Sequence, residues 1–241
     1  MYQYEAVVKV MKENGGYATL KHLYKHAPRV ESSEWETNTP NASIRRIVQR
    51  RERFFKLKPG LWGLESHRED LPKHIGPGVD GEGGSNYSHW YFQGLLAEVG
   101  NTRAADTWVP AQDKNRPFLD GTLGDVRSLD RMPQFGHEER VARAQTVDVV
   151  WFNERRMPDS LLEVEFSTDP QNSLHKFLDL QDYHANFVIV ADETRKGQFE
   201  KRLGQAGFEP IRDRVDFLNF EEVSTLHAAT DDAHRVVQKL A

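Results

Sequence analysis

Residues 146–166 read TVDVVWFNERRMPDSLLEVEF, and this stretch decides the fold class of the chain. Two runs in it, 146–152 and 161–166, are rich in β-branched and aromatic residues and predict two strands. The segment between them, 153–160, is short enough to make the strands antiparallel neighbours. We therefore expect an antiparallel strand pair in the second half of the chain.

Further strands and helices are predicted on both sides of this pair. A continuous apolar run at 187–191 is typical of a buried central strand. Other strands are expected at 106–110 and 215–220, and helices at 89–99, 170–181 and around 199–203. Residues 113–140 give no clear pattern. The order of elements predicts an α/β (α+β) protein with a mixed β-sheet flanked by helices.

Three acidic side chains lie in the predicted strand pair. Asp148 interrupts the first apolar run, and Glu163 and Glu165 share one face of the second strand, because alternate residues of a strand point the same way. Buried carboxylates are costly unless they are paired or bind a metal. Three that converge suit Mg²⁺, with Mn²⁺ as the substitute ion, and such a site can activate water in phosphodiester displacement.

Asp148, followed after a hairpin by Glu163-Val164-Glu165, resembles the PD-(D/E)XK nuclease signature, the core of many type II restriction endonucleases. The usual lysine at the last position of the motif is Glu165 here, which is similar to a minority Glu-x-Glu subgroup. The resemblance covers roughly residues 89–195 and, by topology, extends to about residue 220. It implies that Asp148 and Glu163 are metal ligands and that Glu165 orients or activates the attacking water.

Two more residues extend this resemblance as candidate catalytic groups. Glu98, on the helix before the strand pair, matches an extra acidic residue that many family members carry. Lys176, on the helix after it, is a candidate for a lysine that has migrated from the motif. The alternatives are a helix-end charge for Glu98, a solvated helix lysine for Lys176, and an exposed sheet edge for the strand carboxylates.

Residues 1–66 predict a smaller unit. Apolar spacing and turn residues indicate three helices and a hairpin. The helices are expected at 4–11, from a Thr19 cap through Tyr24, and from Pro40 to about Arg51, and the hairpin strands at 54–57 and 61–64. Three helices followed by a hairpin predict a winged helix.

The third of these helices carries basic and amide side chains opposite an apolar stripe of Ile44, Ile47 and Val48. Guanidinium and amide groups on one helix face suit contacts with phosphates and base edges in a major groove. The candidate DNA-binding residues are Asn41, Ser43, Arg45, Arg46, Gln49 and Arg50.

Segments 41–46, 53–56 and 59–64 together resemble the winged helices called HARE-HTH, which are attached to chromatin proteins and restriction enzymes. The resemblance covers about the first quarter of the chain. It implies DNA recognition, including recognition of modified bases. A winged helix used for protein contacts is the alternative.

Charge divides the chain unevenly. Residues 1–66 are net positive and the remainder is net negative, within a total of −5. The stretch 67–88 is rich in Gly, Pro and charge and predicts a flexible linker, because it offers few apolar side chains to bury. The expected organisation is a winged-helix domain over 1–66, a linker over 67–88 and a nuclease-like domain over 89–241.

Composition excludes several classes of protein. The chain of 241 residues has no cysteine, which rules out disulfides, thiol catalysis and cysteine zinc sites. No apolar run approaches the ~18 residues of a membrane helix, and the first residues do not form a secretory signal. We therefore expect a cytoplasmic protein without a membrane partner.

These features together predict a Mg²⁺-dependent, restriction-type endonuclease whose partner is double-stranded DNA. A homodimer is expected, because two-fold DNA sites match two-fold proteins. Two alternatives stay open. A non-catalytic DNA-binding regulator would explain Glu165 in place of lysine, and an RNA or junction nuclease is compatible because fold does not fix substrate.

Overall fold

A computed structural model describes residues 1–31, 33, 35, 37–50, 52–76 and 84–238. The chain forms two compact units, Met1–Gly84 with Ser224–Ala241, and Ser85–Val223. The last segment, which we assigned to the nuclease-like domain, therefore groups with the N-terminal unit. The reason is packing, since Ala228 is buried in the hydrophobic core of that unit.

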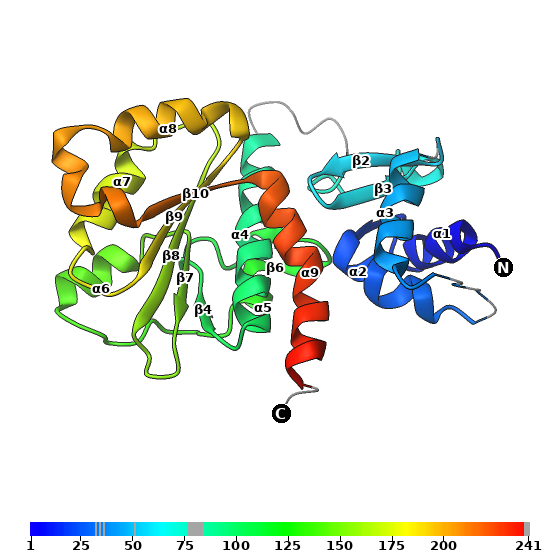
Figure 1. Cartoon of the computed structure of the whole chain (residues 1–241), viewed down its shortest axis with the longest axis horizontal. Coiled ribbons are helices and arrows are strands. Elements are labelled where there is room, and N and C mark those ends of the chain that lie inside the picture. The colour runs from blue at the N-terminus through cyan, green and yellow to red at the C-terminus, as the bar shows by residue number, and fades with distance from the viewer. Residues whose placement is uncertain (32, 34, 36, 51, 77–83, 239–241) are drawn as a thin grey trace. The chain divides into compact units, whose positions relative to one another are not determined.

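In the described part of the first unit, helices pack with a three-stranded sheet, and most of α9 (Phe220–Gln238) belongs to this unit as well. Figure 1 shows the N-terminal elements. The helices are α1 (Gln3–Glu13), α2 (Leu20–His26) and α3 (Pro40–Arg50), with short 3₁₀ turns η1 (Ala27–Arg29) and η2 (Glu65–His67). The strands are β1 (Tyr17–Thr19), β2 (Phe54–Lys58) and β3 (Leu61–Leu64). All pairings are antiparallel, and β3 lies between β1 and β2.

Local chemistry explains these elements. The Thr19 hydroxyl accepts a hydrogen bond of 3.2 Å from the backbone N–H of His22 and so caps α2. Gly60, with a φ of +76°, makes the turn between β2 and β3. The predicted helices and hairpin are confirmed, and β1 is an addition that pairing with β3 creates. The predicted helix end at Arg51 lies outside the described residues.

The stretch predicted as a linker is partly ordered. Leu71 and Ile75 are buried, so these isolated aliphatic side chains find a core. A helix begins at Gly84, and residues 77–83 lie outside the described part of the chain. The prediction of a flexible linker is therefore wrong for both ends of 67–88, because the apolar side chains are too few to form a core alone but enough to join one.

The second unit is built around a five-stranded mixed sheet with the order β10-β9-β8-β7-β4. Its strands are β4 (Asp106–Trp108), β7 (Val149–Phe152), β8 (Pro158–Glu165), β9 (Asn186–Ala191) and β10 (Val215–Asn219), and β5 (Pro117–Phe118) pairs with β6 (Gly121–Thr122) separately. Its helices are α4 (Gly84–Thr102), α5 (Leu123–Val126), α6 (Glu138–Ala144), α7 (Gln171–Asp179), α8 (Lys196–Leu203) and the start of α9 (Phe220–Gln238), with 3₁₀ turns η3 (Glu193–Arg195) and η4 (Ala206–Arg214).

Helices cover both faces of this sheet (Figure 1). Side chains of α6, α7 and α8 form one core with the sheet, in which Val141, Phe177 and Phe199 are buried. On the other face, the Trp151 indole N–H donates to the Leu96 carbonyl of α4 at 3.1 Å. The expected α/β architecture is confirmed.

The strand pair that led the sequence analysis is antiparallel, as predicted, and β8 runs parallel to β9. Segment 113–140, which gave no clear pattern, contains β5, β6, α5 and the start of α6. The helix α9 was not predicted. Within the described part of the chain, no helix has the length and apolarity needed to cross a membrane.

Candidate functional site

The predicted carboxylates meet where β7 begins and β8 ends, in the interior of the sheet. Asp148 comes directly before β7, and Glu163 and Glu165 lie at the end of β8. Because the two strands are antiparallel, the start of β7 lies beside the end of β8. The Asp148 Oδ2 atom accepts a hydrogen bond of 2.8 Å from the Val164 backbone N–H, which fixes the carboxylate next to Glu163.

Glu163 and Glu165 are both buried, with 3% and 5% of their surface exposed. They lie on β8, the middle strand of the sheet, with β9 and β10 on one side and β7 and β4 on the other. Both side chains face α7. An exposed sheet edge therefore does not explain these two residues. Their charge must be compensated inside the protein.

Lys176 on α7 supplies part of that compensation. Its Nζ donates to Glu163 Oε1 at 2.8 Å and to Oε2 at 3.0 Å, and also to the Thr146 carbonyl at 2.8 Å. The lysine side chain is 21% exposed. The structure thus brings this predicted residue into the site, and the interpretation of Lys176 as a solvated helix lysine is wrong.

Two hydroxyl groups hold Glu165. Ser173 Oγ lies 2.5 Å from Glu165 Oε1 and 3.0 Å from Glu163 Oε2, and the Thr168 hydroxyl donates to Glu165 Oε2. Both carboxylate oxygens of Glu165 are engaged within the protein, as are both oxygens of Glu163. The two carboxylates differ in their partners, since hydroxyl groups contact Glu165 whereas Glu163 also receives the ammonium of Lys176.

Helix α4 contributes residues that the sequence analysis missed. His89 Nε2 lies 3.4 Å from Asp148 Oδ1, and the buried Gln93 donates from Nε2 to the Asp148 carbonyl at 2.8 Å and to Asp113 Oδ2 at 3.4 Å. Among the residues that the structure describes, the buried Gln93 Oε1 atom has no hydrogen-bond partner. His89 and Gln93 are four residues apart on the predicted helix and so share a face, but that spacing does not show which segment they contact.

Glu98 lies farther along α4, where it is half-buried. Its negative charge helps burial to raise the pKa of Tyr91. Its membership of the catalytic set stays a prediction. At Asp148, α4 presents an imidazole and an amide.

The cluster concentrates negative charge. Burial, and then the charge of Asp148, raise the pKa of Glu163 against the opposing effects of Lys176 and Ser173. Burial lowers the pKa of His89, but its hydrogen bond to Asp148 and the acidic groups around it leave that pKa raised. Burial also raises the pKa of Asp113. The ionised carboxylates would be stabilised by an added cation.

The donor set for such a cation is small. Among the residues that the structure describes, no group of three or more His, Asp or Glu side chains is arranged to hold a metal ion. Asp148 and Glu163 supply two neighbouring carboxylates where β7 begins and β8 ends. A Mg²⁺ ion commonly takes one or two protein carboxylates and completes its shell with waters and phosphate oxygens, so this pair fits it.

The predicted DNA-binding residues lie on α3 of the first unit. Arg46, Gln49 and Arg50 are exposed, and Asn41 and Arg45 are half-buried. The prediction for Ser43 needs correction, because its side chain is buried. It lies one turn before Ile47 on the side of the helix that packs into the core, so we remove it from the candidate DNA contacts.

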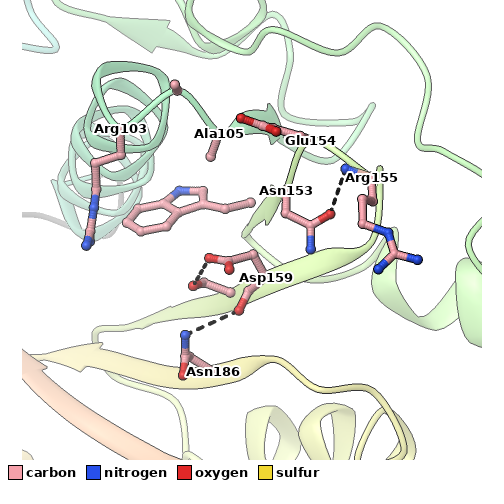
Figure 2. A pocket seen from close by; sticks show the side chains of 10 residues that line it. Arg103, Ala105, Asn153, Glu154, Arg155, Asp159 and Asn186 are labelled. Atoms are coloured by element: carbon pink, nitrogen blue, oxygen red, sulfur yellow. Dashed lines mark hydrogen bonds between the residues drawn. The ribbon is translucent and has the colours of Figure 1, made fainter. Parts of the chain in front are cut away.

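A pocket of about 510 Å³ opens at the other end of the strands, where β8 begins (Figure 2). Arg103, Asn153, Asp159 and Asn186 are among its lining residues. Asp159 lies at the start of β8, whereas the carboxylate cluster lies at its end. The pocket therefore belongs to a different place in the fold and includes none of the predicted site residues.

Comparison with known proteins finds a family model that matches most of the chain, including the whole second unit. The family model described as the C-terminal domain of the type II restriction enzyme NmeDI matches residues 79–239. The type II restriction enzyme NmeDI of Neisseria meningitidis serogroup C is 28% identical over 126 residues, which cover 47% of this chain and 35% of the relative. The match thus spans about a third of that relative's length. No solved structure matches.

Proposed function

Because the chain belongs to the family of the NmeDI-type restriction enzyme C-terminal domain, we propose that it is a restriction-type DNA endonuclease that depends on Mg²⁺ or Mn²⁺. One observation carries this proposal. Asp148 lies against the backbone beside Glu163, and Lys176 lies on that same glutamate. Two carboxylates and a lysine that meet where β8 ends are a suitable set for phosphodiester hydrolysis. The arrangement supports the PD-(D/E)XK resemblance in its Glu-x-Glu form.

In this proposal Asp148 and Glu163 hold the divalent cation. Glu163 is buried, so its ionised form gains from a positive charge. A cation bound there would lower the pKa of a coordinated water and stabilise negative charge on the phosphodiester.

Lys176 has the role that the signature gives to the lysine missing at residue 165. Its ammonium is fixed by three oxygen atoms, two of Glu163 and one of Thr146, yet part of the side chain reaches solvent. A cation in this position can attract the scissile phosphate and orient a water molecule. Glu165 shares the Ser173 hydroxyl with Glu163, so it would hold Glu163 in place and act on water through that support.

The test is a cleavage assay on plasmid and genomic DNA, both unmethylated and methylated, with Mg²⁺, Mn²⁺ or EDTA. We expect products with 5′-phosphate ends in the presence of either ion and intact DNA with EDTA. Intact DNA under all conditions would reject the nuclease proposal and favour the non-catalytic regulator. Symmetric products would support a homodimer, which sedimentation of the DNA-bound protein can check.

We propose further that the first unit is a winged helix that captures double-stranded DNA through α3. The order of its helices, the hairpin formed by β2 and β3, and the exposed side chains of Arg46, Gln49 and Arg50 support this. Modified bases are among the targets that the assay on methylated DNA would identify.

The double variant Arg46→Ala/Arg50→Ala is expected to weaken DNA binding and to lower the slope of log K against log salt by about two, because each lost phosphate contact removes about 0.9. The measurement is DNA affinity over a series of salt concentrations. Lys12→Ala, an exposed cation on α1, is the matched control and should leave the slope unchanged. An unchanged slope in the double variant would favour a protein-contact module.

A further inference from the structure

Ser173 connects the two glutamates of the site. It lies on α7, three residues before Lys176, so both side chains are on one helix face. Its side chain is buried, with 2% of its surface exposed. The Oγ atom is 3.0 Å from Glu163 Oε2 and 2.5 Å from Glu165 Oε1, so one hydroxyl group contacts both carboxyl groups.

The position of this hydroxyl addresses a physical problem. Glu163 and Glu165 alternate along β8 and point to the same face, which brings two acidic groups together in a buried environment. Long side chains in such a place have several rotamers, and repulsion would drive them apart. The Ser173 hydroxyl has one proton to donate, and because its oxygen lies between the two carboxyl groups it limits the positions of both. Thr168 restricts the other oxygen of Glu165.

We propose that Ser173 is a positioning residue for the divalent cation: it holds the Glu163 carboxylate in the orientation that binds the ion, with Glu165 as its second anchor. This inference rests on the function proposed above. Groups that orient metal ligands contribute strongly to affinity, and their removal commonly weakens metal binding by about 10–100-fold.

The experiment compares the full chain with its Ser173→Ala variant. Two readouts are followed against Mg²⁺ concentration, namely the rise in Tm without DNA and the rate of DNA cleavage. We expect Ser173→Ala to raise both Mg²⁺ midpoints by about 10–100-fold. Saturating Mg²⁺ should recover most of the cleavage rate, and Ser173→Thr, which keeps the hydroxyl, should restore both midpoints.

Ser160→Ala is the matched control. Ser160 is also buried, with 5% of its surface exposed, and it lies on β8 itself. Its hydroxyl donates to Asp159 at 3.0 Å, at the end of the strand opposite to the glutamates. Its Mg²⁺ midpoints should equal those of the wild type. If both serine variants shift the midpoints alike, the effect is one of general packing and the inference is rejected.

Unchanged midpoints in Ser173→Ala would also overturn the inference while leaving the proposed function intact. A wild-type protein that cleaves no DNA and shows no Mg²⁺-dependent rise in Tm would instead reject the proposed function, and the inference with it. The two failures are thus distinguishable.

Discussion

Asp148→Asn is expected to lower the rate of DNA cleavage by roughly 10³-fold, because a cation contribution of several kcal/mol is lost and about 1.4 kcal/mol changes a rate tenfold. DNA binding should persist, because the substitution does not alter α3, the helix proposed to capture DNA. Asparagine keeps an oxygen that can accept the 2.8 Å hydrogen bond from the Val164 N–H, so the local backbone contact can survive. The measurement is cleavage and binding of the same DNA in Mg²⁺.

Asp159→Asn is the control for this variant. Asp159 is an exposed residue at the start of β8, the end of the strand away from the carboxylate cluster. It accepts a hydrogen bond from Ser160 there. The same chemical change there should leave cleavage at the wild-type rate. Full activity in Asp148→Asn would show that Asp148 is not part of the catalytic site.

The strands and the strand carboxylates could be predicted from local sequence because their signals are local. The β-branched runs at 146–152 and 161–166 required no knowledge of the rest of the chain, and alternation alone placed Glu163 and Glu165 on one face. The family comparison supports the restriction-enzyme resemblance in its coarse form. The roles of the individual residues remain predictions.

The missed residues depend on contacts between distant segments. Gln93 and Asp148 are 55 positions apart, and only the packing of α4 against β7 brings them together. A buried glutamine in an apolar helix has no local signature of its partner. Ser173 falls within the predicted helix 170–181, but its importance depends on which face of β8 that helix covers. The burial of Leu71 and Ile75 was missed for a similar reason. Isolated aliphatic residues become part of a core only when another element of the fold supplies the rest of the apolar surface.

Lys176→Met is expected to lower the cleavage rate by roughly 100-fold or more at saturating Mg²⁺, because it removes a preorganised positive charge beside the proposed reaction centre. Lys176→Arg keeps the charge and should retain more activity than methionine does. Lys201→Met, on the exposed side of α8, is the matched control and should leave cleavage unchanged. Wild-type rates in folded Lys176→Met would reject the catalytic role of Lys176.

Stability must be separated from chemistry in this variant, because breaking a buried ion pair can cost about 3–5 kcal/mol when one charge is left alone. Lys176→Met leaves Glu163 buried without its 2.8 Å partner. Adding Glu163→Gln removes that charge, so the double variant should recover much of the lost Tm. Both variants that contain Glu163→Gln should be inactive whichever role Lys176 has, because Glu163 is a proposed ligand of the cation. The decision therefore rests on Lys176→Met alone: a catalytic Lys176 predicts a slow variant at temperatures where it is fully folded, whereas a purely structural Lys176 predicts the wild-type rate there.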